Sequence, residues 1–161
     1  IFLDSIGTVF ISLIAGPFVG MATAVITSLI TGSFSPEYLA FMPVAIVMAL
    51  CMGILGKFRM KNLVIKTIVC AFCLVAIAIV VSAPIIVLVY GGNTGNATAG
   101  ITTFFLASGQ NIWTAVFSTN FITETTDKII TVIVAMSIIK SMSSRYLIKF
   151  KYGENYINLK K

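Results

Sequence analysis

The chain of 161 residues is 58% hydrophobic and only 10% charged, with a formal net charge of +6 at pH 7. Soluble domains average about 45–50% apolar and 25% charged residues, so this composition excludes an ordinary water-soluble fold. The mean hydropathy of +1.05 instead predicts an all-α integral membrane protein, built as one helical bundle over residues 1–161.

The first third of the chain predicts short helices separated by turn residues. Residues 1–15 are largely apolar, Gly16 and Pro17 interrupt them, and residues 18–30 continue the apolar run. Each piece is short for a span of about 20 residues, so we expect two short or tilted helices joined by a tight turn. Turn formers mark a loop over residues 31–37, and residues 38–56 are the next expected span.

The rest of the chain predicts two further spans with a polar segment between them. Residues 63–90 are a long apolar run, in which Pro84 is expected to kink the helix or end it early. Residues 91–96 form a glycine-rich loop. Residues 98–120 mix polar and aromatic side chains, which predicts a helix and loop at the interface or folded back into the bundle. Residues 121–147 are the last expected span.

The distribution of charge predicts the orientation in the membrane. All basic residues but Lys128 fall into two groups, which are Lys57, Arg59, Lys61 and Lys66, and Lys140, Arg145, Lys149, Lys151, Lys160 and Lys161. The positive-inside rule places both groups in the cytoplasm, with residues 148–161 as a basic cytoplasmic tail. Residues 91–120 are then external, and Asp4, Glu37, Glu124 and Asp127 lie on or near the outer side.

This topology predicts a multi-pass protein of the cell membrane with a cytoplasmic C-terminus. An even number of spans with both ends inside requires one more span before Ile1. We therefore expect about five spans in this chain and about six in the full-length protein, with the first helix missing upstream.

Several function classes are disfavoured by what the sequence lacks. Without histidine, neither a zinc site nor a Ser/His/Asp or Cys/His catalytic arrangement is expected, and Cys51, Cys70 and Cys73 fit reduced packing residues. No phosphate-binding GxxxxGK[ST] motif occurs, and the basic residues are not interleaved with aromatics as in nucleic-acid-binding patches. We expect no enzyme, no cofactor and no nucleic-acid partner. An intramembrane enzyme that uses Glu124 or Asp127 is the open alternative.

The candidate site begins with a polar face on the last span. Asn120, Glu124 and Lys128 are spaced four residues apart, which places them on one side of a helix. This face could line a ligand cavity that opens to the outside, because charges inside spans are costly unless they serve a cavity or a partner. It could equally be an interfacial helix end whose Lys128 makes a structural pair. Asp127 and Lys128 suit the structural role, and Asn120 and Glu124 suit a ligand.

The external segment adds amides and one tryptophan to the candidate site. Such a mixture suits a small planar ligand that stacks on aromatic rings and is oriented by few hydrogen bonds. Trp113 could instead belong to the aromatic belt at the membrane surface. The predicted substrate-binding residues are Asp4, Asn96, Gln110, Asn111, Trp113, Asn120 and Glu124.

Small residues recur every four positions at Gly16, Gly20 and Ala24. This small-xxx-small pattern lets helices approach closely. It favours packing within the bundle, although docking onto a partner is the alternative.

Two local strings resemble a known family. FLDSIGT at residues 2–8, followed by AGP at 15–17, and Asp127-Lys128, followed by an apolar run and a basic tail, resemble the substrate-binding S components of energy-coupling factor vitamin transporters. The resemblance implies about six helices, cytoplasmic ends and a pocket near the outer face. The AxxxA docking motif typical of the family's first helix is not found, so no docking residues are carried over.

The resemblance also implies a function in the bacterial cell membrane. Such a subunit captures a vitamin or vitamin precursor outside, and a transmembrane coupling subunit with two ATPase subunits drives its uptake. The acidic residues on the outer side favour a neutral or cationic ligand over an anion. The alternatives are a membrane domain that senses a small molecule without transport, and a structural subunit without a ligand.

Overall fold

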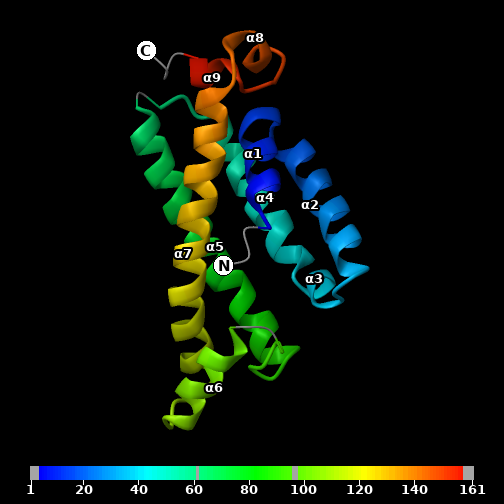
Figure 1. Ribbon diagram of the computed structural model, residues 1–161, viewed down its shortest axis with the longest axis vertical. Helices are drawn as coiled ribbons and strands as arrows, with labels where there is room; N and C mark the ends of the chain where they lie inside the picture. Colours follow the sequence, from blue (N-terminus) through cyan, green and yellow to red (C-terminus); the bar gives the residue numbers. More distant parts are fainter. Residues whose placement is uncertain (1–3, 61, 96–97, 158–161) are drawn as a thin grey trace.

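The computed structural model describes residues 4–60, 62–95 and 98–157, and their regular structure is entirely helical (Figure 1). The all-α prediction is thereby confirmed for the described part of the chain. In chain order the helices are α1 (Ile6–Ala15), α2 (Pro17–Gly32), α3 (Glu37–Ala40), α4 (Met42–Lys57), α5 (Leu63–Leu88), α6 (Ala99–Ala107), α7 (Ile112–Ser141), α8 (Ser144–Leu147) and α9 (Glu154–Ile157).

The two short N-terminal helices meet where the sequence predicts a tight turn. Gly16 adopts a φ of 104°, a conformation that residues with a side chain rarely take, and Pro17 opens α2 in the first helical position. The Gly16 N–H donates to the Ser12 carbonyl at 3.1 Å, which closes the last turn of α1. α2 therefore folds back against α1 within a single residue.

Small residues bring α1, α2 and α4 into close contact. A Cβ added to Gly20 would overlap the Ser12 side chain, and Ala24, one turn further along α2, is buried. On α4, a Cβ at Gly53 would overlap the backbone of Pro17, and one at Gly56 would overlap the Leu13 carbonyl. The small-residue pattern of α2 thus serves packing inside the bundle, as the favoured alternative predicted.

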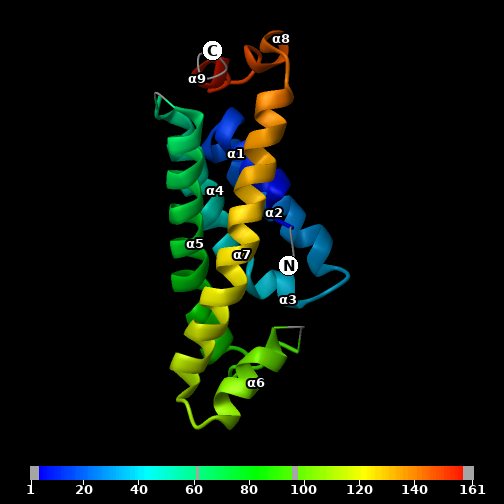
Figure 2. The ribbon, with the colours of Figure 1, turned by 60° about the vertical axis from the view of Figure 1, so that its left-hand side comes forward.

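The main core lies where α1, α4, α5 and α7 meet. Leu13, Met52, Leu74 and Val132 represent these four helices in it, and all of them are fully buried. α5 and α7 run side by side along the length of the molecule, and α6 lies at the end opposite α8 and α9 (Figures 1 and 2). This arrangement separates the molecule into two distinct ends.

The end formed by α8 and α9 is tied together by the C-terminal segment. The Tyr152 N–H donates to the Ile14 carbonyl at 2.9 Å, and the Tyr156 hydroxyl donates to the Leu13 carbonyl at 3.3 Å. Burial raises the pKa of Tyr156, so its hydroxyl stays protonated and able to donate. The segment therefore covers the turn between α1 and α2.

Lys66, at the start of α5, reaches the same end. Its ammonium donates to the carbonyls of Gly56 and Phe58 at 3.3 and 3.1 Å, where α4 ends, and lies 4.0 Å from the centre of the Tyr156 ring. A cation beside the free carbonyls of a helix C-terminus is favourable. The described residues of the two basic groups thus flank one end of the molecule, although Lys66 itself is fully buried.

Two expected boundaries differ from the structure, and of the two outcomes expected at Pro84 the early end of the helix does not occur. The expected span 38–56 is divided at Phe41 into α3 and α4, with Pro43 near the start of α4, where proline is tolerated. Pro84 does not end α5, which continues to Leu88, because one missing hydrogen bond near a helix end is tolerated in a packed helix. The last helix ends at Ser141, with α8 separate, rather than continuing to residue 147.

The same helix also begins earlier than expected. α7 starts at Ile112 instead of residue 121, so the polar residues from Thr114 to Asn120 are helical. The Thr119 hydroxyl bonds to the Ala115 carbonyl within the helix at 2.9 Å. Polar side chains satisfied in this way do not disrupt a helix, and the polarity of this stretch was a misleading signal.

Among the described helices, α5 is the one both long and apolar enough to cross a bilayer. α1, α2 and α4 are apolar but shorter. α7 is long enough, yet it carries Glu124, Asp127 and Lys128 near its middle. The number of spans therefore does not follow from helix length and hydropathy alone.

We expect Gly53→Ala to destabilise the protein by about 1–3 kcal/mol, because the new methyl group meets the backbone of Pro17, which cannot rotate away. Gly7→Ala is the matched control, since a Cβ at Gly7, also on a helix, meets nothing within 4 Å. Melting temperatures in a nonionic detergent would test this difference. Equal melting temperatures for the two variants would contradict the proposed close packing of α2 and α4.

Candidate functional site

A cavity of about 260 Å³ lies between the first helices and α7. Its wall combines apolar side chains from the core with hydroxyl, amide and charged groups. The lining residues are Asp4, Ser5, Thr8, Val9, Ala24, Thr27, Ser28, Thr31, Glu37, Tyr38, Phe41, Val44, Ala45, Met48, Ser82, Ile86, Thr94, Thr98, Asn120, Thr123, Glu124 and Lys128. A partly apolar hollow with a few converging polar groups is the usual form of a small-molecule site.

α7 supplies the polar side of this cavity. Asn120, Glu124 and Lys128 are one turn apart and all line it, as the face predicted from their spacing requires. The Asn120 amide is almost fully buried, and its Nδ2 donates to the Ser82 hydroxyl on α5 at 2.9 Å. This bond fixes the side chain of Asn120 at the cavity wall and joins α5 to α7.

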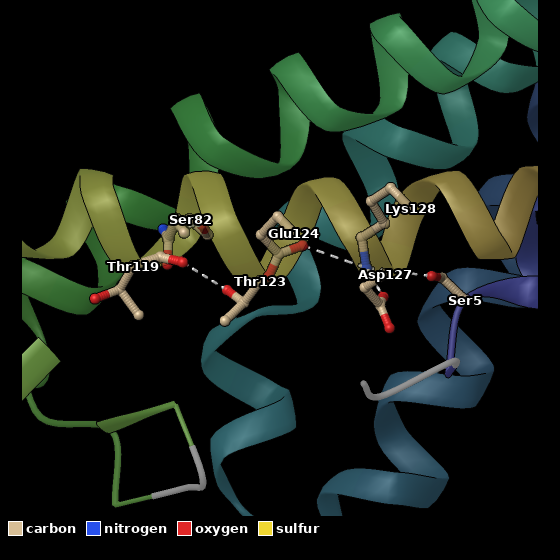
Figure 3. A network of polar contacts seen from close by, with 8 residues as sticks. Ser5, Ser82, Thr119, Thr123, Glu124, Asp127 and Lys128 are labelled. Atoms are coloured by element: carbon tan, nitrogen blue, oxygen red, sulfur yellow. Dashed lines mark hydrogen bonds and ion pairs between the residues drawn. The ribbon is translucent and has the colours of Figure 1, made fainter. Parts of the chain in front are cut away.

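Lys128 is the centre of a buried charged network (Figure 3). Its Nζ lies 2.8 Å from Asp127 Oδ2 and 3.4 Å from Glu124 Oε2, and it donates to the Ser5 hydroxyl at 3.4 Å. Only 6% of the Lys128 side chain and 4% of the Asp127 side chain are exposed, compared with 23% for Glu124. Asp127 and Lys128 therefore form a structural pair, and Glu124 is the more accessible carboxylate.

The segment before α1 and the short helix α3 bring further polar groups to the cavity. Asp4, Glu37 and Tyr38 all line it. Burial raises the pKa of the Tyr38 hydroxyl, and the nearby carboxylates of Asp4 and Glu37 raise it further. Phe41 also lines the cavity, and its ring is stacked on that of Tyr90, which follows α5, with centroids 5.9 Å apart. Tyr38 and Phe41 thus give this wall an aromatic surface.

The structure brings some of the predicted site residues to the cavity and places others away from it. Asp4, Asn120 and Glu124 are brought together at the cavity. Gln110 and Asn111 are exposed between α6 and α7 and do not line it. Trp113 does not line it either.

Trp113 lies on the surface of α7 rather than at the cavity. The residue is 43% exposed, and its ring lies near that of Phe117, with the two centroids 6.5 Å apart. Asn96 lies outside the described residues.

The sequence interpretation missed the contribution of α2. Thr27, Ser28 and Thr31 place three hydroxyl groups along the cavity. With Ala24 they follow a helical spacing of three and four residues, so a polar stripe could have been found within the apolar run. The Thr31 hydroxyl bonds to the Thr27 carbonyl at 2.8 Å, which shows how such residues are accommodated in an apolar helix.

We expect Lys128→Met to destabilise the protein by about 3–5 kcal/mol, because it leaves the buried carboxylate of Asp127 without its cation. Lys140→Met removes a charge of the same sign from an exposed position on α7 and should have little effect. Thermal unfolding in detergent measures both. A similarly small change in melting temperature for both variants would show that the network around Lys128 does not stabilise the fold.

The comparisons with known proteins provide no relative from which a function could be transferred. The chain matches no family model, and no curated protein and no solved structure is found to be similar. A functional proposal therefore depends on the geometry of the cavity and on the motifs of the sequence.

Proposed function

We propose that the chain is the substrate-binding subunit of an importer of the energy-coupling factor type. It captures a vitamin or vitamin precursor at the outer face of the bacterial cell membrane. The observation that carries this proposal is the cavity of about 260 Å³, whose polar and aromatic wall is built by α1–α5 and α7. Small-molecule pockets span about 300–1,000 Å³, so this cavity suits a small ligand of one or two rings.

The surface of the bundle supports its insertion into a membrane. Only 22% of the most apolar window of α5 is buried inside the molecule, which is unlike the core helix of a soluble protein. Phe72 and Val80 on this helix are 76% and 63% exposed. Large contiguous apolar surfaces are rare on soluble monomers, and lipid is the natural environment for this one.

Helix lengths permit α5 and α7 to cross the membrane fully, whereas α1, α2 and α4 are shorter than its hydrocarbon core. At 1.5 Å per residue, α5 and α7 are about 39 and 45 Å long, and α2 and α4 are each about 24 Å long. α1 measures about 15 Å, half of a hydrocarbon core of about 30 Å. In this arrangement α1 begins near the middle of the membrane, beside the cavity.

The charges support the orientation. The described basic residues apart from Lys128 flank the end formed by α8 and α9, and the carboxylates of Asp4, Glu37 and Glu124 line the cavity. By the positive-inside rule the end with α8 and α9 faces the cytoplasm, and the end with α6 faces outward. The ligand then reaches the cavity from outside the cell.

The first experiment is a thermal-shift screen of the purified full-length protein against vitamins and precursors of positive, neutral and negative charge. Mass spectrometry of small molecules retained through purification accompanies it. A ligand present at about 100 times its Kd should stabilise the native state by about 2.7 kcal/mol. Copurification of a coupling subunit and ATPases would support transport, whereas a bound ligand without them would favour a sensor. No ligand from either method would contradict the proposal.

We expect Asn120→Ala to weaken binding of the ligand found in this screen by about three- to tenfold, the effect of one lost hydrogen bond at the cavity wall. Asn111→Ala is the matched control, because Asn111 is exposed and does not line the cavity. Isothermal titration measures both affinities. Equal losses of affinity in the two variants would show that the ligand binds outside this cavity.

A further inference from the structure

We infer that the ligand of this cavity is an organic cation whose positive charge is received by the carboxylate of Glu124. The inference rests on the proposed ligand-binding function and adds the chemical class of the ligand. It follows from the charges around the cavity, from the nature of its wall and from the position of Glu124 on α7.

The cavity wall carries more negative than positive charge. Three carboxylates line it, from Asp4, Glu37 and Glu124, against the single ammonium of Lys128. The other described lysine and arginine side chains do not line it. A cleft with one excess sign of charge and low-dielectric walls concentrates ligands of the opposite sign.

Lys128 does not cancel this excess, because its closest partner is outside the lining. Its Nζ lies 2.8 Å from Asp127, which does not line the cavity, and 3.4 Å from Glu124, which does. The positive charge of Lys128 is therefore matched first by Asp127. A second cation beside Glu124 would balance its charge when a ligand excludes water from the cavity.

The wall fits an organic cation better than a metal ion. Within the described residues no group of three or more acidic or cysteine side chains converges closely enough to hold a metal ion. Tyr38 and Phe41 instead contribute aromatic side chains to the wall, and Val44 and Ile86 contribute apolar surface. Aromatic rings attract organic cations through their negative faces, and apolar groups accommodate the rest of such a ligand.

Glu124 is the carboxylate placed to meet the charge. It stands between Asn120 and Lys128 on the cavity face of α7, and its side chain is more exposed than that of Lys128. A ligand cation at Glu124 replaces the 3.4 Å contact with Lys128, and Lys128 keeps its bonds to Asp127 and Ser5. The buried pair thus stays neutral with ligand bound.

The test compares ligands of similar shape and different charge on the full-length protein in a nonionic detergent. The probes are the cation of nicotinamide methylated on its ring nitrogen, neutral nicotinamide and anionic nicotinate, together with whichever vitamin or precursor stabilises the protein most. Isothermal titration gives Kd for each compound. The cationic probe should bind at least about tenfold more tightly than the neutral one, which corresponds to about 1.4 kcal/mol.

Glu124→Gln should remove this preference, because the amide keeps the size of the side chain and loses its charge. Glu154→Gln is the control, since Glu154 is exposed on α9 at the other end of the molecule. Equal or tighter binding of the neutral or anionic probe, or a preference that survives Glu124→Gln, overturns the inference. A tightest vitamin that is neutral or anionic overturns it too and leaves the binding function intact, whereas failure of every compound to bind overturns both.

Discussion

The structure depends on how one buried ammonium is neutralised. Lys128 sits in the middle of α7, where an uncompensated charge in a membrane would cost on the order of several kcal/mol. Its contacts with Asp127 and Glu124 come from its own helix, and its contact with Ser5 reaches the start of α1. The ion pair of Lys128 with Asp127 is therefore formed within α7. The bond from Lys128 to Ser5 ties the start of α1 to α7 beside the cavity.

The two ends of the molecule are held in different ways. At the end with α8 and α9, Tyr152, Tyr156 and Lys66 bind backbone carbonyls of α1 and α4, and glycines allow the helices to touch. Toward the other end the helices are separated by the cavity, and α5 meets α7 through polar contacts such as that between Asn120 and Ser82. Close packing at one end lets the other end hold an open space without loss of the fold.

Local signals in the sequence were sufficient for some features of the fold and of the site. The turn at Gly16 and Pro17 was predictable because glycine and proline impose backbone geometry by themselves. The shared face of Asn120, Glu124 and Lys128 was predictable because helical spacing decides it.

Features that depend on distant parts of the chain were not predictable. The polar stripe of α2 is visible in the sequence, but its place in the wall of a cavity that α7 completes depends on partners far away in the sequence. Gln110 and Asn111 illustrate the same limit, because their polarity was visible and their distance from the cavity was not.

The charged network also explains how a cavity wall can carry several carboxylates. Lys128 lies within reach of both Asp127 and Glu124, so neither carboxylate on α7 is left without a cation. A ligand cation must then compete with Lys128 for Glu124, and its affinity reflects the difference between the two contacts rather than the full strength of the new one. Because the Lys128 contact with Glu124 is the longer of the two, it is the one that can be exchanged while the pair with Asp127 continues to hold α7 in place. Asp127 thus contributes to the stability of the fold, and Glu124, one turn away on the same helix, contributes to binding.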